Sequence, residues 1–230
     1  MTSDHVSAAG LVEAVNVGEP RPVQVNGRTV WTAIWKSPVA GRVPLRGVNL
    51  LGDDQADRSV HGGPDKAVYA YSAEETELWE DELGVSLGPG AFGENLTVRG
   101  LPVSAAVIGE RWAVGSALLE VAQPRLPCFK LGLRMGDPGF VKRFAVTGRP
   151  GAYLRVISEG DIGAGDTIAV LERPAHGVTS ELVSRAILLE PELLEQALLA
   201  PELPADLREW MDGRAAAAAA LRRVRAKGDS

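Results

Sequence analysis

The sequence contains very little cysteine, histidine or aromatic residue. One cysteine, Cys128, and three histidines occur among 230 residues, and aromatic residues make up 5% of the chain. A single cysteine cannot form an intramolecular disulfide, which is typical of proteins in a reducing compartment. A structural zinc site needs four Cys or His ligands, so this composition is a poor match for zinc. We therefore expect neither a disulfide framework nor a zinc-stabilised fold.

Long apolar runs are also missing. No stretch of about 18 consecutive apolar residues occurs, which argues against a membrane-spanning helix. The first ten residues include Asp4 and His5 and lack a basic segment followed by an apolar one, so no secretory signal is expected. The formal charge of −6 gives the surface as a whole no attraction for nucleic acids or acidic membranes. We predict a cytoplasmic protein that binds no membrane and whose main partner is not nucleic acid.

Short strand-like segments separated by glycine and proline fill the first three-quarters of the chain. The dipeptide Asn26-Gly27 predicts a two-residue hairpin turn, because both turn positions need positive φ angles. Many short strands with few helices predict a mainly antiparallel sheet that curls towards a barrel. The expected strands are 11–17, 23–25, 29–34, 43–51, 67–71, 111–114, 117–123, 152–157 and 167–171.

Helix signals are few within this region and repeated after it. Ser72 and Glu75 form a capping-box pattern in front of a helical segment. Further along, Thr179, Pro191 and Pro204 are suited to begin three successive helices.

Together these patterns predict the α+β class. We expect a mainly antiparallel, β-barrel-like domain at residues 1–174 and a small all-α three-helix domain at residues 175–230.

The most informative segment, residues 123–155, is strongly basic within an acidic protein. It contains a single acidic residue, Asp137, against seven basic ones: Arg125, Lys130, Arg134, Lys142, Arg143, Arg149 and Arg155. Such an excess is destabilised by mutual repulsion unless an anion binds there, and arginine matches phosphate or carboxylate oxygens well. A solvated basic face on the outside of a sheet is the alternative interpretation.

Cys128 lies within this basic segment. It follows Pro127, which is suited to a helix start, and stands close to Arg125 and Lys130. A thiolate at a helix N-terminus beside two cations is stabilised, and a thiolate attacks electrophiles or ligates soft metals. The alternatives are a small buried apolar residue and a cysteine–histidine dyad with His61, for which no third, orienting group is evident.

Two other segments carry candidate ligand-binding residues. Gly62-Gly63 allows a backbone to approach a ligand closely, and His61 and Lys66 beside it could donate to ligand oxygens. Asn95 could bond the edge of a heterocycle. The alternatives are an ordinary glycine–proline turn and an asparagine that fixes its own loop.

Taken together, these segments resemble the MOSC domain, named for the C-terminal part of molybdenum cofactor sulfurases. The resemblance spans roughly residues 8–172, and the helices that follow are similar to the three-helix extension of the bacterial stand-alone subgroup. The segments that carry it are Asp54–Tyr71, Phe92–Gly100, Gln123–Leu131 and Gly148–Val156. Ala122 and Glu110 depart from the pattern, at positions where a hydroxyl residue and an aspartate are expected.

The resemblance implies a barrel-like fold that binds a molybdenum–pterin cofactor (molybdopterin). It implies an oxidoreductase that reduces small N-hydroxylated compounds such as N-hydroxylaminopurine as detoxification, with an external flavin or haem reductase as electron donor. Cys128 would be the catalytic residue and the molybdenum ligand. The candidate cofactor-binding residues are Arg125, Lys130, His61, Lys66, Asn95, Arg149 and Arg155.

Two alternatives remain open at this point. The same pocket would suit a cofactor or sulfur carrier that holds a persulfide on Cys128 without turnover of its own. A nucleic-acid or protein-binding module would instead use the basic end of the chain, where Arg222, Arg223, Arg225 and Lys227 cluster. Four basic residues on a terminal helix are usually a solvated face favoured by the helix dipole.

Overall fold

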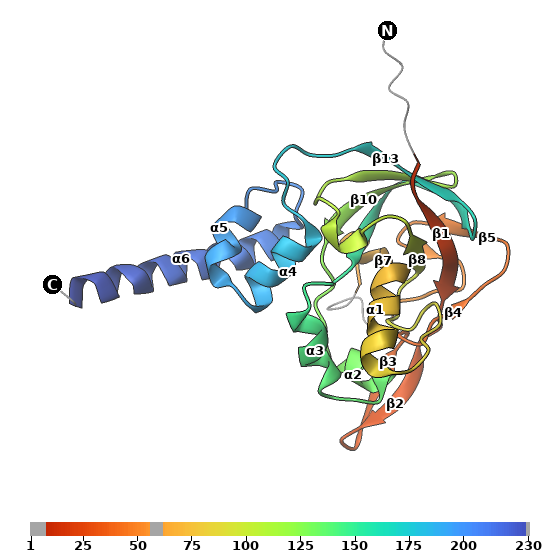
Figure 1. Ribbon diagram of the computed structural model, residues 1–230, viewed down its shortest axis with the longest axis horizontal. Coiled ribbons are helices and arrows are strands. Elements are labelled where there is room, and N and C mark those ends of the chain that lie inside the picture. The colour runs from red at the N-terminus through yellow and green to blue at the C-terminus, as the bar shows by residue number, and fades with distance from the viewer. Residues whose placement is uncertain (1–7, 56–61, 229–230) are drawn as a thin grey trace, which may run out of the picture.

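The computed structural model describes residues 8–55 and 62–228 (Figure 1). Its central element is a closed barrel built from β1 (Ala8–Val17), β7 (Val68–Ser72), β8 (Leu96–Arg99), β9 (Arg111–Val114), β10 (Ala117–Gln123), β11 (Ala152–Ser158) and β13 (Thr167–Glu172). The strands pair in the order β13-β9-β10-β11-β7-β8-β1, and pairing of β13 with β1 closes the barrel. The expected α+β class, with a mainly antiparallel barrel, is confirmed.

One strand pair of the barrel is parallel. β7 and β8 run in the same direction, whereas the other neighbouring barrel strands are antiparallel. A parallel pair needs a crossover connection, and α1 (Ala73–Leu83) provides it. The helix begins after Ser72 as predicted, but the capping box is wrong. Ser72 Oγ bonds Glu74 Oε2 at 2.6 Å and makes no capping bond to the helix backbone.

The remaining strands form small additions to the barrel. They are β2 (Arg21–Val25), β3 (Arg28–Thr32), β4 (Ser37–Pro38), β5 (Arg42–Arg46), β6 (Asn49–Leu50) and β12 (Gly160–Gly163). Asn26 and Gly27 have φ angles of 48° and 75° and join β2 to β3, as predicted. The single strand expected at 43–51 is wrong, because Gly47 adopts a φ of 57° and turns the chain into the β5–β6 hairpin.

The helices lie in two groups. They are α2 (Phe129–Met135), α3 (Phe140–Val146), α4 (Ser180–Leu188), α5 (Leu194–Ala197) and α6 (Ala205–Gly228), with 3-10 turns η1 (Pro64–Lys66), η2 (Val103–Ala105) and η3 (Pro191–Leu193). α1, α2 and α3 lie on one side of the barrel, whereas α6 extends away from it (Figure 1). No helix among the described residues has the length and apolar content needed to cross a bilayer.

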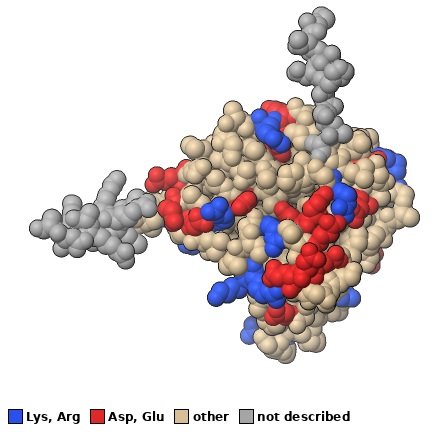
Figure 2. Space-filling model, viewed as in Figure 1, with Lys and Arg blue, Asp and Glu red and all other residues tan. Residues whose placement is uncertain are grey.

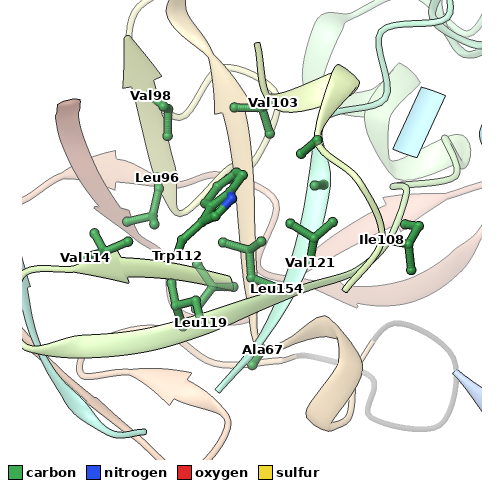
Figure 3. Close-up of a cluster of buried hydrophobic side chains, with 14 of the residues drawn as sticks. Ala67, Leu96, Val98, Val103, Ile108, Trp112, Val114, Leu119, Val121 and Leu154 are labelled. Carbon is green, nitrogen blue, oxygen red and sulfur yellow. The ribbon is translucent and has the colours of Figure 1, made fainter. Parts of the chain in front are cut away.

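Two apolar clusters hold the fold together. Trp112 and Leu119 are fully buried inside the barrel among aliphatic side chains (Figure 3), and Val183 and Met211 of the C-terminal helices belong to the same cluster. This cluster contains residues from both sides of the predicted domain boundary between residues 174 and 175, so the division into two domains stays a prediction. The second, aromatic cluster packs between β7 and helices α1 to α3 and consists mainly of Tyr69, Tyr71, Trp79, Phe92, Phe140 and Phe144.

A buried chain of hydrogen bonds joins α1 to the C-terminal helices. Ser104 Oγ donates to Glu75 Oε2 at 2.9 Å and accepts from the backbone N–H of Gly151 at 2.9 Å. The carbonyl of Gly151 in turn accepts from Ser180 Oγ, at the start of α4, at 2.5 Å. Burial raises the pKa of Glu75 to about 7, although the hydrogen bond from Ser104 opposes this rise.

The stability of the protein should therefore depend on pH through Glu75. Between pH 4.5, its ordinary pKa, and about 7, the folded state keeps a proton that the unfolded state has lost, so stability falls as the pH rises. Glu75→Gln removes this titration. In urea denaturation the variant should exceed the wild type by about 3 kcal/mol at alkaline pH and match it at acidic pH. A constant difference between the two proteins would contradict the role assigned to Glu75.

Candidate functional site

A pocket of about 110 Å³ lies beside the N-terminal end of α2. The residues at its wall come from six stretches of chain that the barrel brings together. Five of the predicted site residues line it: Lys66, Asn95, Arg125, Cys128 and Lys130. His61, another predicted residue, falls outside the described part of the chain.

Cys128 stands at the cap position of α2. Its backbone is extended (φ −130°, ψ 174°) and its carbonyl accepts a hydrogen bond from the N–H of Leu131 at 2.9 Å. The side chain is half-buried and makes no capping bond, so the sulfur faces the pocket without a helical partner. The predicted helix start is confirmed, although α2 begins at Phe129 and not at Pro127.

Arg125 is a buried cation in the wall of this pocket. Its side chain is packed against aromatic rings, with the guanidinium carbon 5.2 Å from the Tyr69 ring centre and 5.6 Å from that of Phe144. Burial lowers its pKa, but the neighbouring Tyr69, Tyr153 and Cys128 raise it, with a net rise. Nη1 is excluded from solvent and has no acceptor within the described chain. An unsatisfied charged donor is unfavourable unless a ligand supplies the acceptor.

Lys130 and Lys66 add two more positive charges. Lys130 is buried on the first turn of α2, and no carboxylate of the described residues lies within ion-pair distance of it. Lys66 ends the 3-10 turn that follows the glycine pair. The side chain of Gln55 holds this turn, because its Oε1 accepts from the N–H of Gly63 at 2.8 Å and its Nε2 donates to the carbonyl of Lys66 at 3.2 Å.

Asn95 lines the pocket but is fully engaged by the protein. Its Oδ1 accepts from the N–H of Tyr69 at 3.1 Å, and its Nδ2 donates to the carbonyl of Asn16 and to Asp53 Oδ2, at 3.2 and 2.8 Å. Asp53 also pairs with Lys36, a pocket residue whose pKa is lowered by burial and raised by the Asp53 carboxylate. The side chain of Asn95 therefore fixes the pocket wall and has no donor left for a ligand.

Arg149 and Arg155 lie elsewhere. The guanidinium of Arg149 stacks over Trp79 at 4.7 Å. Arg155 pairs with Asp65 at 2.8 Å and with Glu120 at 3.2 Å, and it donates to the backbone carbonyl of Glu202, between α5 and α6, at 2.9 Å. Neither residue lines the Cys128 pocket, and both link secondary-structure elements to one another.

The pocket residues that were not identified from the sequence include Lys36, Asp53, Tyr69 and Tyr153. The two tyrosines lie in segments that carry the MOSC resemblance, which was a usable signal. Burial raises the pKa of Tyr69 and Tyr153, so both phenols stay protonated at neutral pH. Nothing in the local sequence around Lys36 marks it, because its place in the pocket depends on the β3–β4 connection.

The arrangement suits an anionic ligand held beside a thiol. Four cations (Lys36, Lys66, Arg125 and Lys130) face two carboxylates (Asp53 and Asp54) around the pocket. Within the described chain, no group of three or more His, Cys, Asp or Glu side chains is placed to hold a metal ion. A metal at this site would therefore need further ligands from the molecule that carries it. A volume of about 110 Å³ is below that of pockets that enclose a whole ligand, so only one end of a cofactor would be enclosed.

Comparison with known proteins identifies a matching domain family and several similar proteins. Residues 57–169 match the MOSC domain family model. The chain is 39% identical over 174 residues to Uncharacterized protein YflK of Bacillus subtilis, which covers 76% of this chain and 79% of that protein. It is 37% identical over 169 residues to a Gibberella moniliformis protein named Reductase, and the match spans 72% of this chain but only 30% of that protein. The crystal structure of YiiM from Geobacillus stearothermophilus superposes with a TM-score of 0.73 at 32% identity, covering 90% of this chain and 99% of that one.

Proposed function

The chain belongs to the MOSC domain family, and from that premise we propose that it binds a molybdenum–pterin cofactor in the Cys128 pocket and reduces small N-hydroxylated compounds. MOSC domains are associated with the molybdenum cofactor. The observation that carries the proposal is the buried, unpartnered Nη1 of Arg125 in the pocket that also contains the only cysteine. A phosphate-bearing, metal-bearing ligand satisfies both groups at once.

Five pocket residues have a defined part in this proposal. Arg125, Lys130 and Lys66 would bind the negative groups of the cofactor, and Cys128 would supply a soft thiolate ligand to molybdenum. When bound, the cofactor supplies the two-electron redox chemistry. Overall, R–NH–OH takes up two electrons and two protons, its N–O bond breaks, and R–NH₂ and water are formed. An external flavin or haem reductase would supply the electrons, and the protonated phenol of Tyr153 lies in the wall, where it can donate to a bound ligand.

A preparation from a cofactor-producing host tests the proposal. Molybdenum and pterin should be present in equal amounts, and N-hydroxylaminopurine should be reduced when a purified flavin or haem reductase is added. A cofactor or sulfur carrier would contain molybdenum and reduce nothing. Protein that carries neither molybdenum nor pterin would contradict the proposal as a whole.

Replacement of Arg125 tests cofactor binding separately from the stability of the fold. Arg125→Met keeps a long unbranched side chain but removes the buried charge, so stability should equal or exceed that of the wild type. Loss of charge-assisted bonds should lower pterin content at least about tenfold. Arg149→Met, which removes an arginine outside the pocket, is the matched control and should keep its pterin. Equal pterin content in the two variants would remove Arg125 from the binding site.

A further inference from the structure

A second pocket lies at the opposite end of α2. It has a volume of about 350 Å³, within the range of pockets that hold small molecules. Its walls are the segment that follows α1 and the turn between α2 and α3, and most of its lining is apolar. The apolar side chains are Leu83, Val85, Leu87, Ala91, Met135 and Phe140. Phe140 and Ala91 are buried in the aromatic cluster, so this floor is fixed.

Arg134 is the cation in this lining. Its Nε is excluded from solvent and has no hydrogen-bond acceptor in the described chain. Burial lowers the pKa of Arg134, and no carboxylate of the described residues lies within ion-pair distance of it. Arg125 shares one feature with Arg134, a single guanidinium nitrogen that is excluded from solvent and has no acceptor in the described chain. In both places this N–H donor has lost water without gaining a partner, which is unfavourable until an anion binds.

The acidic residue in this pocket has its partners already. Asp137 Oδ1 accepts from the N–H of Gly139 at 2.7 Å, and Oδ2 lies 3.8 Å from Arg143 Nη1. Arg134 therefore lacks a negatively charged partner, whereas the Asp137 carboxylate already has its partners. The pocket should bind an anion and not a cation. Because six of the ten lining residues have apolar side chains, that anion should carry a hydrocarbon body.

We propose that this pocket binds a small organic monocarboxylate, with its carboxylate on Arg134 and its apolar body against Met135 and Phe140. A guanidinium matches the planar carboxylate in shape as well as in charge. A phosphate dianion without an apolar part would leave the hydrocarbon lining uncovered. The site uses no residue of the Cys128 pocket, so it stands whether or not the chain is a molybdenum enzyme.

The three methionines of the chain allow a direct test. In the full-length protein with carbon-13 methionine methyl groups, phenylacetate at about 1 mM, the weak end of specific affinities, should shift the Met135 signal. The Met211 signal should stay in place, because Met211 is fully buried among the C-terminal helices. The neutral analogue phenylacetamide should bind at least about tenfold more weakly.

Two charge-removing variants complete the experiment. Arg134→Gln should weaken phenylacetate binding at least about tenfold, with an unchanged Met211 signal as proof of folding. Lys142→Gln removes one charge from an exposed position of α3 outside the pocket and should bind like the wild type. No shift of Met135 with phenylacetate, equal shifts with the amide, or full binding by Arg134→Gln would each overturn the proposal.

Discussion

Cys128→Ala should lower the reduction of N-hydroxylaminopurine by more than about 100-fold, because even changes in the outer shell of a metal site cost 10- to 100-fold. The fold should be kept. The side chain of Cys128 is half-buried and forms no hydrogen bond to the helix it precedes, so its loss should change stability by less than about 1 kcal/mol. Initial rates with the purified electron donor and thermal unfolding measure the two effects separately.

Cofactor content and a serine variant make this test specific. Cys128→Ser keeps the size of the side chain but replaces a soft sulfur ligand by oxygen, so it should also be inactive. The pterin content of both variants should exceed that of Arg125→Met, since the cationic residues remain. Turnover equal to the wild type by Cys128→Ala carrying the same amount of molybdenum would refute ligation by sulfur.

Asp53→Ala should destabilise the protein by about 3–5 kcal/mol, the usual cost of leaving a buried charge without its partner. The Asp53 and Lys36 side chains are 5% and 9% exposed. Asp53 also accepts from the N–H of Gly18 at 2.9 Å and from Asn95 at 2.8 Å, so the substitution leaves three donors unsatisfied. Urea denaturation of wild type and variant measures the loss.

The partner substitution should cost less. In Lys36→Met the Asp53 carboxylate keeps two N–H donors, so the destabilisation should be less than about half of that of Asp53→Ala. The Asp53 charge raises the pKa of Lys36, and without it burial lowers that pKa further below 10.5. The unfolded state then binds more protons than the folded state, so the stability of Asp53→Ala should rise as the pH approaches 10.5. Equal destabilisation by Asp53→Ala and Lys36→Met would contradict the smaller effect expected for Lys36→Met.

Much of the barrel was predictable from local patterns. β9 and β10 have the bounds that alternation and turn residues predict, and Thr179 caps α4 with a 3.1 Å bond to the N–H of Leu182. β8 and α3 were not identified. β8 directly follows Asn95, and its strand state depends on parallel pairing with β7, a long-range contact that local sequence does not encode.

The candidate site was predictable in part. Charge density and the single cysteine pointed to Arg125, Cys128 and Lys130, which meet in one pocket. Charge density alone could not show that Arg125 lines the pocket and Arg149 does not. That difference depends on the direction in which each side chain leaves the backbone of the folded chain. Figure 2 shows acidic side chains gathered over α1 with basic ones beside them over α3, where Arg143 bonds Glu82 at 2.8 Å. Part of the basic segment therefore pairs with the acidic helix α1.

Closure of the barrel by β13 has a consequence for how the chain folds during its synthesis. β1 precedes the other described barrel strands in the chain, but β13 covers one of its two edges, and β13 also covers one edge of β9. The pairing of Leu11 with Thr167 gives the native state a high contact order, which is typical of slow-folding domains. Until residue 172 has been synthesised, two unpaired strand edges can associate with other chains. A nascent chain interrupted before Thr167 should therefore depend on chaperones to remain monomeric.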